Sequence, residues 1–177
     1  MKYQIIPKQT LKGIVKAVHD GDSFKIQFEN GEVEWIRLWG CDAPEVVSNH
    51  VTQSQPYGKE SGDQLRNLIK GNDVVVETLF RDQYQRMICK LKLIMEDPAT
   101  EDLIVDLTSH LISNGWAWFL EEPSMTKEEK IQLKGWHDLT KKTKNGLWGY
   151  PGRKLRPSTW RNNHKKFSLT KEFPDLW

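Results

Sequence analysis

The fold is decided by residues 20–39, which read DGDSFKIQFENGEVEWIRLW. Apolar and polar side chains alternate from Phe24 to Phe28, which is the period-two pattern of a half-buried β-strand. The pair Asn30-Gly31 comes next and predicts a hairpin with a type I′ turn, because that turn needs positive φ at both central positions. The apolar residues of the segment 33–39 then form the returning strand. This stretch therefore predicts two antiparallel strands joined by a tight turn.

The neighbouring sequence adds three more strands to this hairpin. The pair Asp20-Gly21 marks another tight turn, preceded by a strand over residues 12–18. Two later apolar runs, 73–80 and 87–95, also read as strands, and a short charged turn joins them. The chain therefore starts as an antiparallel meander and contains five strands in total.

Three segments carry the spacing of helices. Apolar residues recur at intervals of three and four within 57–70 and within 103–113. A third helix begins after Thr126, whose hydroxyl forms a capping box with Glu129, and Gly146 is expected to end it. With one helix after the third strand and two after the fifth, we predict an α+β fold, in which a five-stranded OB-type β-barrel carries three helices.

Length and composition are those of one globular domain. The chain has 177 residues, 37% of them hydrophobic and 28% charged, and a formal net charge of +2. This weak positive charge permits a nucleic-acid partner without indicating one. The two cysteines, Cys41 and Cys89, lie in apolar strand-like runs and are expected to be buried thiols, although the sequence leaves a single disulfide open.

No targeting signal or membrane segment is visible in the sequence. The first 12 residues lack the apolar stretch and cleavage site of a secretory signal, and no run approaches the roughly 20 apolar residues of a membrane span. We expect a monomer without a membrane partner, cytoplasmic as written, or secreted if the N-terminus has been trimmed.

We divide the chain into an N-terminal extension (1–10), one folded domain (11–150) and a basic, tryptophan-containing C-terminal tail (151–177). The tail can be a phosphate-tracking arm or a solvated segment, and the sequence leaves both open. Its basic residues before the first acid are Arg153, Lys154, Arg156, Arg161, Lys165 and Lys166.

Charged residues at the predicted strand ends suggest a site. Each has an ordinary explanation: Asp22 belongs to a turn, Arg37 can cover apolar surface with its stem, and Asp42 and Glu45 flank a proline that ends a strand. Together with Arg86, however, they fall at strand ends that can meet at one rim of a barrel. Carboxylates can hold a hard cation and activate water, and arginines can bind phosphate, so the set predicts metal-assisted hydrolysis of a phosphodiester.

Several short motifs occur in a distinctive order along the chain: DGDS (20–23), IRLWGCDAPE (36–45), Tyr57-Gly58, DQYQR (82–86), NGWA (114–117) and GLW (146–148). Their order and approximate spacing resemble those of the staphylococcal nuclease (thermonuclease) family over roughly residues 11–150. This resemblance implies a calcium-dependent endonuclease that cleaves DNA and RNA and leaves 3′-phosphate ends, on a five-stranded barrel capped by three helices.

The resemblance also implies roles for individual residues. Tyr84 matches a position that contacts substrate, and Trp118 is a candidate for stacking on a base, with packing in the core as the alternative. The family's calcium ligands correspond to Asp22, Asp42 and the backbone carbonyl of Ala43, its general base to Glu45, and its phosphate-binding arginines to Arg37 and Arg86.

The sequence departs from the family pattern at three places. Gln85 replaces the usual glycine before the second arginine, Gln83 replaces a frequent lysine, and Glu121 adds an acid near the expected substrate. The rival function is a non-catalytic module of the same fold that binds oligonucleotides or a protein. Such a module is expected to lack at least one of the five charged residues, and all five are present, which favours a nuclease acting on DNA or RNA.

Overall fold

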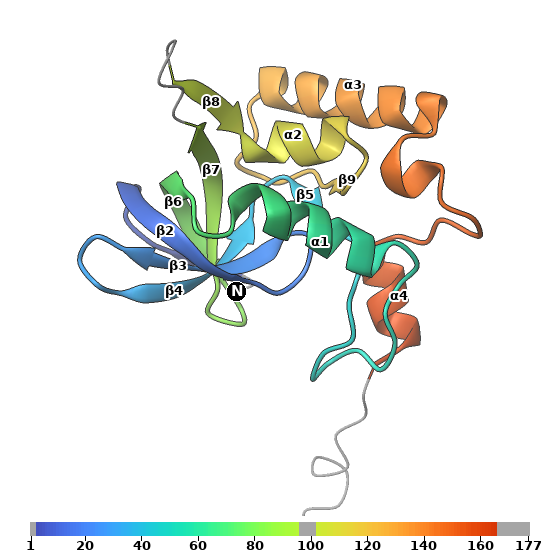
Figure 1. Cartoon of the computed structure of the whole chain (residues 1–177), viewed down its shortest axis with the longest axis horizontal. Coiled ribbons are helices and arrows are strands. Elements are labelled where there is room, and N and C mark those ends of the chain that lie inside the picture. The colour runs from blue at the N-terminus through green and yellow to red at the C-terminus, as the bar shows by residue number, and fades with distance from the viewer. Residues whose placement is uncertain (1–2, 96–101, 166–177) are drawn as a thin grey trace, which may run out of the picture.

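The computed structural model describes residues 3–95 and 102–165. It is a mixed α+β fold, with helices gathered around a strand-rich sheet (Figure 1). The strands are β1 (Tyr3–Ile5), β2 (Thr10–Val18), β3 (Ser23–Phe28), β4 (Val33–Leu38), β5 (Cys41–Asp42), β6 (Asp73–Asp82), β7 (Met87–Met95), β8 (Leu103–Asp106) and β9 (Trp118–Phe119). The helices are α1 (Gly58–Ile69), α2 (Leu107–Ser113), α3 (Lys127–Thr143), the short 3₁₀ helix η1 (Gly146–Trp148) and α4 (Pro157–Asn163).

The main sheet has seven strands in the order β1-β6-β2-β3-β4-β7-β8. Strand β6 pairs with β7 as well as with β2, so the five strands β2, β3, β4, β7 and β6 form a closed ring of pairs. These five are the strands predicted from the sequence. The sequence-based prediction of five strands missed four others: β1 and β8 extend the main sheet, and β5 pairs with β9 in a second, two-stranded sheet.

The hairpin between β3 and β4 is present, but its predicted turn type is wrong. The loop spans four residues, 29–32, and only Gly31 has positive φ, at 85°. Its N–H donates a hydrogen bond to the carbonyl of Phe28 at 2.9 Å. A longer loop of this kind does not need two consecutive left-handed residues, so Asn30 keeps a negative φ.

The described part of the chain contains four α-helices rather than the three predicted. The segment predicted as one helix over 103–113 divides at Asp106: the aliphatic residues before it pair with β7 as β8, and the helix begins after it. Asp106 caps α2 by accepting the N–H of Ser109 at 2.8 Å. The fourth helix, α4, lies in the segment expected to be a tail.

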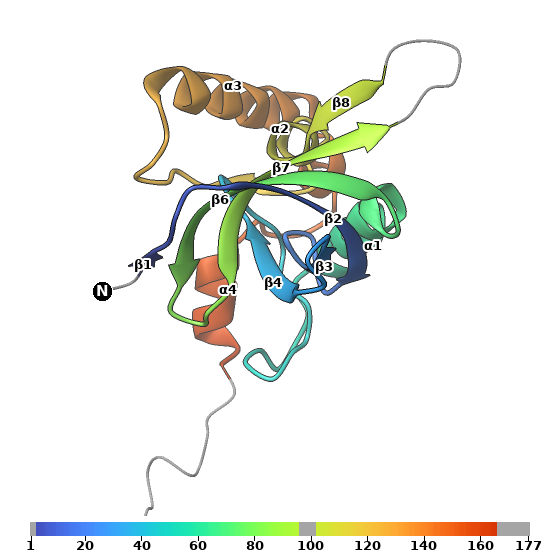
Figure 2. The same cartoon turned by 90° about the vertical axis from the view of Figure 1, so that its left-hand side faces the viewer.

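The helices lie on two sides of the sheet. Helices α2 and α3 pack against each other near β9, while α1 packs against β2 and buries Leu65 and Ile69 (Figures 1 and 2). The capping box of Thr126 and Glu129 is formed at the start of α3, as predicted. None of the helices in the described segments has the length and apolar character needed to cross a membrane.

Both cysteines are buried free thiols, so the disulfide that the sequence left open is not formed. The two ends of the chain also contribute structure. Strand β1, in the expected N-terminal extension, pairs with β6, and α4 lies beside the loop that follows β5 (Figure 1). Residues 1–2 of that extension and 166–177 of the tail lie outside the described residues.

Candidate functional site

Arg37 holds two aspartates together at the centre of the site. Its Nη1 lies 2.8 Å from Asp22 Oδ1, and its Nη2 lies 2.8 Å from Asp42 Oδ1. Asp22 and Asp42 are buried, and only 12% of the Arg37 side chain is exposed. The other carboxylate oxygen of Asp22 accepts the backbone N–H of Ala43 at 2.7 Å. The structure therefore brings the predicted ligands Asp22, Asp42 and Ala43 to one place, with Arg37 between the carboxylates.

Arg86 joins this group through Ser23. Its Nη1 donates to Ser23 Oγ at 3.1 Å, and that hydroxyl donates to Asp22 Oδ1 at 2.9 Å. Asp82 orients the arginine: it accepts from Arg86 Nε at 2.9 Å and from the backbone N–H groups of Tyr84 and Arg86. Sequence reasoning assigned no role to Ser23 or Asp82, although both stand inside the motifs that carry the family resemblance.

Glu45 is fixed by its backbone. Its N–H donates to Gln55 Oε1 at 3.2 Å, and its carbonyl accepts the Gln55 N–H at 2.8 Å. Burial raises the pKa of Glu45 to about 7; Arg161 opposes this shift and Asp22 adds to it. A carboxylate whose pKa lies this close to neutral pH is a stronger base than an exposed glutamate.

Asp20 is a further acid of the site that sequence reasoning treated as turn chemistry. Its Oδ1 accepts the backbone N–H of Asp22 at 3.1 Å, which is the turn contact expected of DGD. Burial, followed by repulsion from the Asp22 carboxylate, raises the pKa of Asp20 to about 8. Several acidic groups are therefore crowded near Arg37.

A third arginine, Arg161 of α4, enters the site from the end of the described chain. It forms an ion pair with Glu45, and its Nη1 lies 3.4 Å from Asp42 Oδ1. The sequence signalled it only as one of several basic residues in the tail. Nothing in that run distinguished Arg161 from its neighbours.

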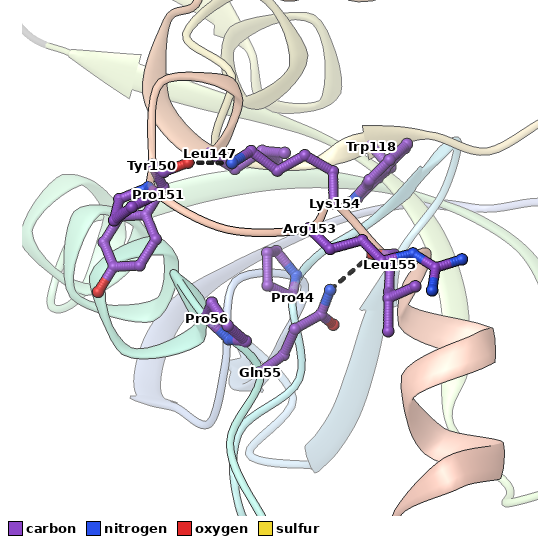
Figure 3. A pocket seen from close by; sticks show the side chains of 10 residues that line it. All are labelled: Pro44, Gln55, Pro56, Trp118, Leu147, Tyr150, Pro151, Arg153, Lys154 and Leu155. Atoms are coloured by element: carbon purple, nitrogen blue, oxygen red, sulfur yellow. Dashed lines mark hydrogen bonds between the residues drawn. The ribbon is translucent and has the colours of Figure 1, made fainter.

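The segment around α4 is attached to the loop that follows Glu45. The N–H of Thr52 donates to the carbonyl of His164 at 2.9 Å, and Trp160 Nε1 donates to the carbonyl of Gln53 at 2.8 Å. Gln55 Nε2 donates to the carbonyl of Leu155 at 2.7 Å, across a small pocket between Gln55 and residues 150–155 (Figure 3). The described part of the tail is therefore a packed element beside the site.

The two predicted substrate-contacting residues differ in exposure. Tyr84 is 63% exposed, and its ring centroid lies 5.6 Å from the guanidinium carbon of Arg86. Trp118 is only 7% exposed: Arg156 covers its ring at 4.9 Å and Trp148 packs edge-on at 4.3 Å. This geometry leaves Tyr84 accessible to a ligand and favours the packing alternative for Trp118.

The donor atoms of the site suit a hard cation. Within residues 3–95 and 102–165, no three histidine, cysteine, aspartate or glutamate side chains form a ready-made metal cluster. Asp22 and Asp42 nevertheless offer carboxylate oxygens beside the backbone of Ala43. Burial, and after it repulsion from Asp22, raises the pKa of Asp20, and a divalent cation nearby would offset that repulsion. Calcium accepts such mixed sets of carboxylate, carbonyl and water oxygens.

The chain is similar to proteins whose names describe them as nucleases. It is 30% identical over 183 aligned residues to the "Probable endonuclease LCL3" of Komagataella phaffii, covering 88% of this chain and 76% of that protein. It is 29% identical over 136 residues to an "Uncharacterized endonuclease" of Escherichia coli O157:H7, covering 72% and 78%. For the "Staphylococcal-like nuclease CAN1" of Arabidopsis thaliana the identity is 26% over 148 residues, covering 79% of this chain and 38% of that protein.

The family match covers most of the site residues, although Asp22 and Ser23 precede it. The family model described as "Staphylococcal nuclease homologue" matches residues 35–150, which include Arg37, Asp42, Glu45 and Arg86. The matched region is more than half of the chain and contains most of β4 and all of β6 and β7. By these matches and by its fold, the chain belongs to the staphylococcal nuclease homologue family.

Proposed function

We propose that this protein is a calcium-dependent endonuclease that hydrolyses the phosphodiester bonds of DNA and RNA with little sequence specificity. The observation that carries the proposal is the contact of Arg37 with both Asp22 and Asp42, next to Glu45 and linked to Arg86 through Ser23. The nuclease names of the relatives support the same activity.

In this proposal Asp22, Asp42 and the carbonyl of Ala43 would hold calcium, which also accepts water as a ligand. Calcium would supply positive charge that offsets the negative charge gathering on the phosphate in the transition state. Histidine ligands are not part of this set, in keeping with the oxygen ligands that calcium prefers.

The side chains of the site have separate tasks. Glu45 accepts a proton from the attacking water, a task helped by its raised pKa. Arg37 and Arg86 now donate to carboxylates, and a phosphate offers acceptor oxygens of the same kind to their planar guanidinium groups. They stabilise the additional negative charge of the five-coordinate transition state, and loss of the 5′-oxygen leaves a 3′-phosphate end.

Cleavage of single-stranded DNA tests the proposal. The protein is incubated with labelled DNA and calcium, with EDTA as the metal-free control, beside Arg37→Ala, Glu45→Ala and the matched control Lys142→Ala on the exposed face of α3. We expect cleavage only with calcium, reduced by roughly 100-fold or more in the first two variants and unchanged in the third.

The same assay addresses substrate range and the rival function. Two results support the full proposal: an RNA oligonucleotide is cleaved at a similar rate, and the products carry 3′-phosphates that a 3′-phosphatase removes. Binding of DNA without cleavage under all conditions contradicts it and favours the non-catalytic module.

A further inference from the structure

Helix α4 brings a cationic side chain into a site whose other residues come from the first half of the chain. Arg161 contacts Asp42, which lies 119 positions earlier in the sequence, and it pairs with Glu45. Its helix is tied to the loop 51–55 by backbone and side-chain hydrogen bonds. The placement of Arg161 therefore follows from the packing of α4 and is not a chance contact of a loose tail.

Arg161 and Arg37 converge on the same acceptor atom. Asp42 Oδ1 lies 2.8 Å from Arg37 Nη2 and 3.4 Å from Arg161 Nη1. Two guanidinium groups that share one acceptor oxygen lie close enough together for both to donate to a single anion that carries several oxygens.

The two arginines differ in their freedom to move. Arg37 is 12% exposed and is fixed by two buried aspartates, whereas 38% of the Arg161 side chain is exposed and its main partner is the single carboxylate of Glu45. Arg161 can therefore change partner by giving up fewer contacts than Arg37. A phosphate group beside Glu45 offers its guanidinium group acceptor oxygens in exchange for those of the carboxylate.

We propose that Arg161 is a third phosphate-binding residue of this site and that it contacts a phosphate of the bound polynucleotide. The proposal rests on the proposed nuclease function for its class of ligand. In the free protein Arg161 neutralises Glu45. With substrate bound it donates to phosphate oxygens and leaves the Glu45 carboxylate free to accept a proton.

Binding without cleavage tests the role of Arg161. Fluorescence anisotropy of a fluorescein-labelled oligothymidylate is followed in EGTA with the full chain, with Arg161→Ala, Arg161→Lys and the control Lys142→Ala. We expect Arg161→Ala to weaken binding by about tenfold, the worth of one charge-assisted contact. The slope of log Kd against log salt should fall by about 0.7, as for one lost contact to single-stranded nucleic acid. Arg161→Lys should keep part of the affinity that Arg161→Ala loses. The control Lys142→Ala should bind as tightly as the unsubstituted protein.

A second background separates binding of phosphate from support of Glu45. In Glu45→Ala, Arg161 has no carboxylate partner at that position, so we expect tighter binding than in the unsubstituted protein. Adding Arg161→Ala should remove this gain. If Arg161 acted only by holding Glu45, the additional substitution would leave the affinity of Glu45→Ala unchanged, which would overturn the proposal.

Two further results would also overturn it. One is tighter binding in Arg161→Ala, which would make the arginine a competitor of the substrate. The other is an equal loss in Lys165→Ala, which would make the tail a diffuse electrostatic arm. If alanine loosens α4, seen as a change in tryptophan fluorescence, Arg161→Gln keeps a hydrogen-bonding side chain without the charge and gives the same comparison. Failure of the nuclease function itself would show differently, as Arg161-dependent binding without calcium-dependent cleavage.

Discussion

The backbone of Gly58 lies directly against the backbone of Glu45, since a Cβ atom at position 58 would be 2.2 Å from the Glu45 carbonyl oxygen. The start of α1 therefore sets the position of the proposed general base. Gly58→Ala should push Glu45 away without removing any reactive group. We expect kcat to fall by at least about tenfold, because small misplacements of a catalytic group are costly.

Gly135 provides the matched control for this substitution. It lies within α3, and a Cβ there would have no neighbour within 4 Å. Gly135→Ala should leave DNA cleavage unchanged and raise the free energy of unfolding by about 0.5–1 kcal/mol, because alanine favours the helix. Full activity in Gly58→Ala would contradict the proposed place of Glu45 in the mechanism.

Lysine should not replace either phosphate-binding arginine. Arg37→Lys and Arg86→Lys keep the charge but lose the planar pair of donors that now contact Asp22 and Asp42, or Asp82 and Ser23. We expect kcat/KM for DNA cleavage to fall by at least roughly tenfold in each variant. Circular dichroism spectra like that of the unsubstituted protein would show that the lower kcat/KM does not come from unfolding. Retained activity would contradict the role of the paired guanidinium donors.

Gln85 occupies a backbone conformation that suits glycine. Its φ is 64°, in the left-handed region, where a side chain costs about 1–2 kcal/mol. Gln85→Gly should therefore raise the free energy of unfolding by up to about 1 kcal/mol in urea titrations. Gln83→Gly, two residues earlier in the same turn but without positive φ, should give no gain. A loss of stability in Gln85→Gly would show that its side chain makes a compensating contact.

Protonation of His137 should destabilise the fold in acid. Burial, helped by Lys141 and Arg156, lowers the pKa of His137 to about 4, and its Nδ1 accepts the backbone N–H of Phe119 at 3.3 Å. Between pH 6.5 and 4 the unfolded chain then binds up to one more proton than the native state at this residue. The free energy of unfolding should fall over this range as the pH decreases, by at most about 3 kcal/mol.

Urea titrations at several pH values, compared with those of His137→Gln, measure this contribution. The variant should be less sensitive to acid over the same range. Parallel pH profiles for the two proteins would contradict the prediction.

The strands of the ring could be predicted because their information is local. Alternation from Phe24 to Phe28 reports one buried face, and the five charged residues of the site stand at ends that the strand order brings together. Residues 103–106 were misread because a short aliphatic run suits a strand or a helix equally, and only its pairing with β7 decides. The two extra contacts of Arg86, to Asp82 and Ser23, depend on turn geometry that a pattern does not show.

The role of the tail could not be predicted for a different reason. Helix α4 has seven residues and buries only Pro157, so its sequence carries no amphipathic pattern. Its position depends on partners such as Thr52 and Gln55, about 100 residues earlier in the chain. The raised pKa of Glu45 has the same origin, because burial of its carboxylate depends on elements that meet only in the folded chain.

The pairing of β4 with both of its neighbours has a consequence for the accuracy of the site. Arg37 is opposite Ser23 in β3 and opposite Ile88 in β7, while Ile36 and Leu38 on either side of it are fully buried. A slip of one residue in this register would turn Arg37 into the core and expose both aliphatic side chains, at a cost of about 3–6 kcal/mol. The direction in which the arginine points is thus enforced by the apolar side chains next to it. Substituting Ile36 or Leu38 by a larger or smaller side chain should make the orientation of Arg37 less precise before the substitution unfolds the protein.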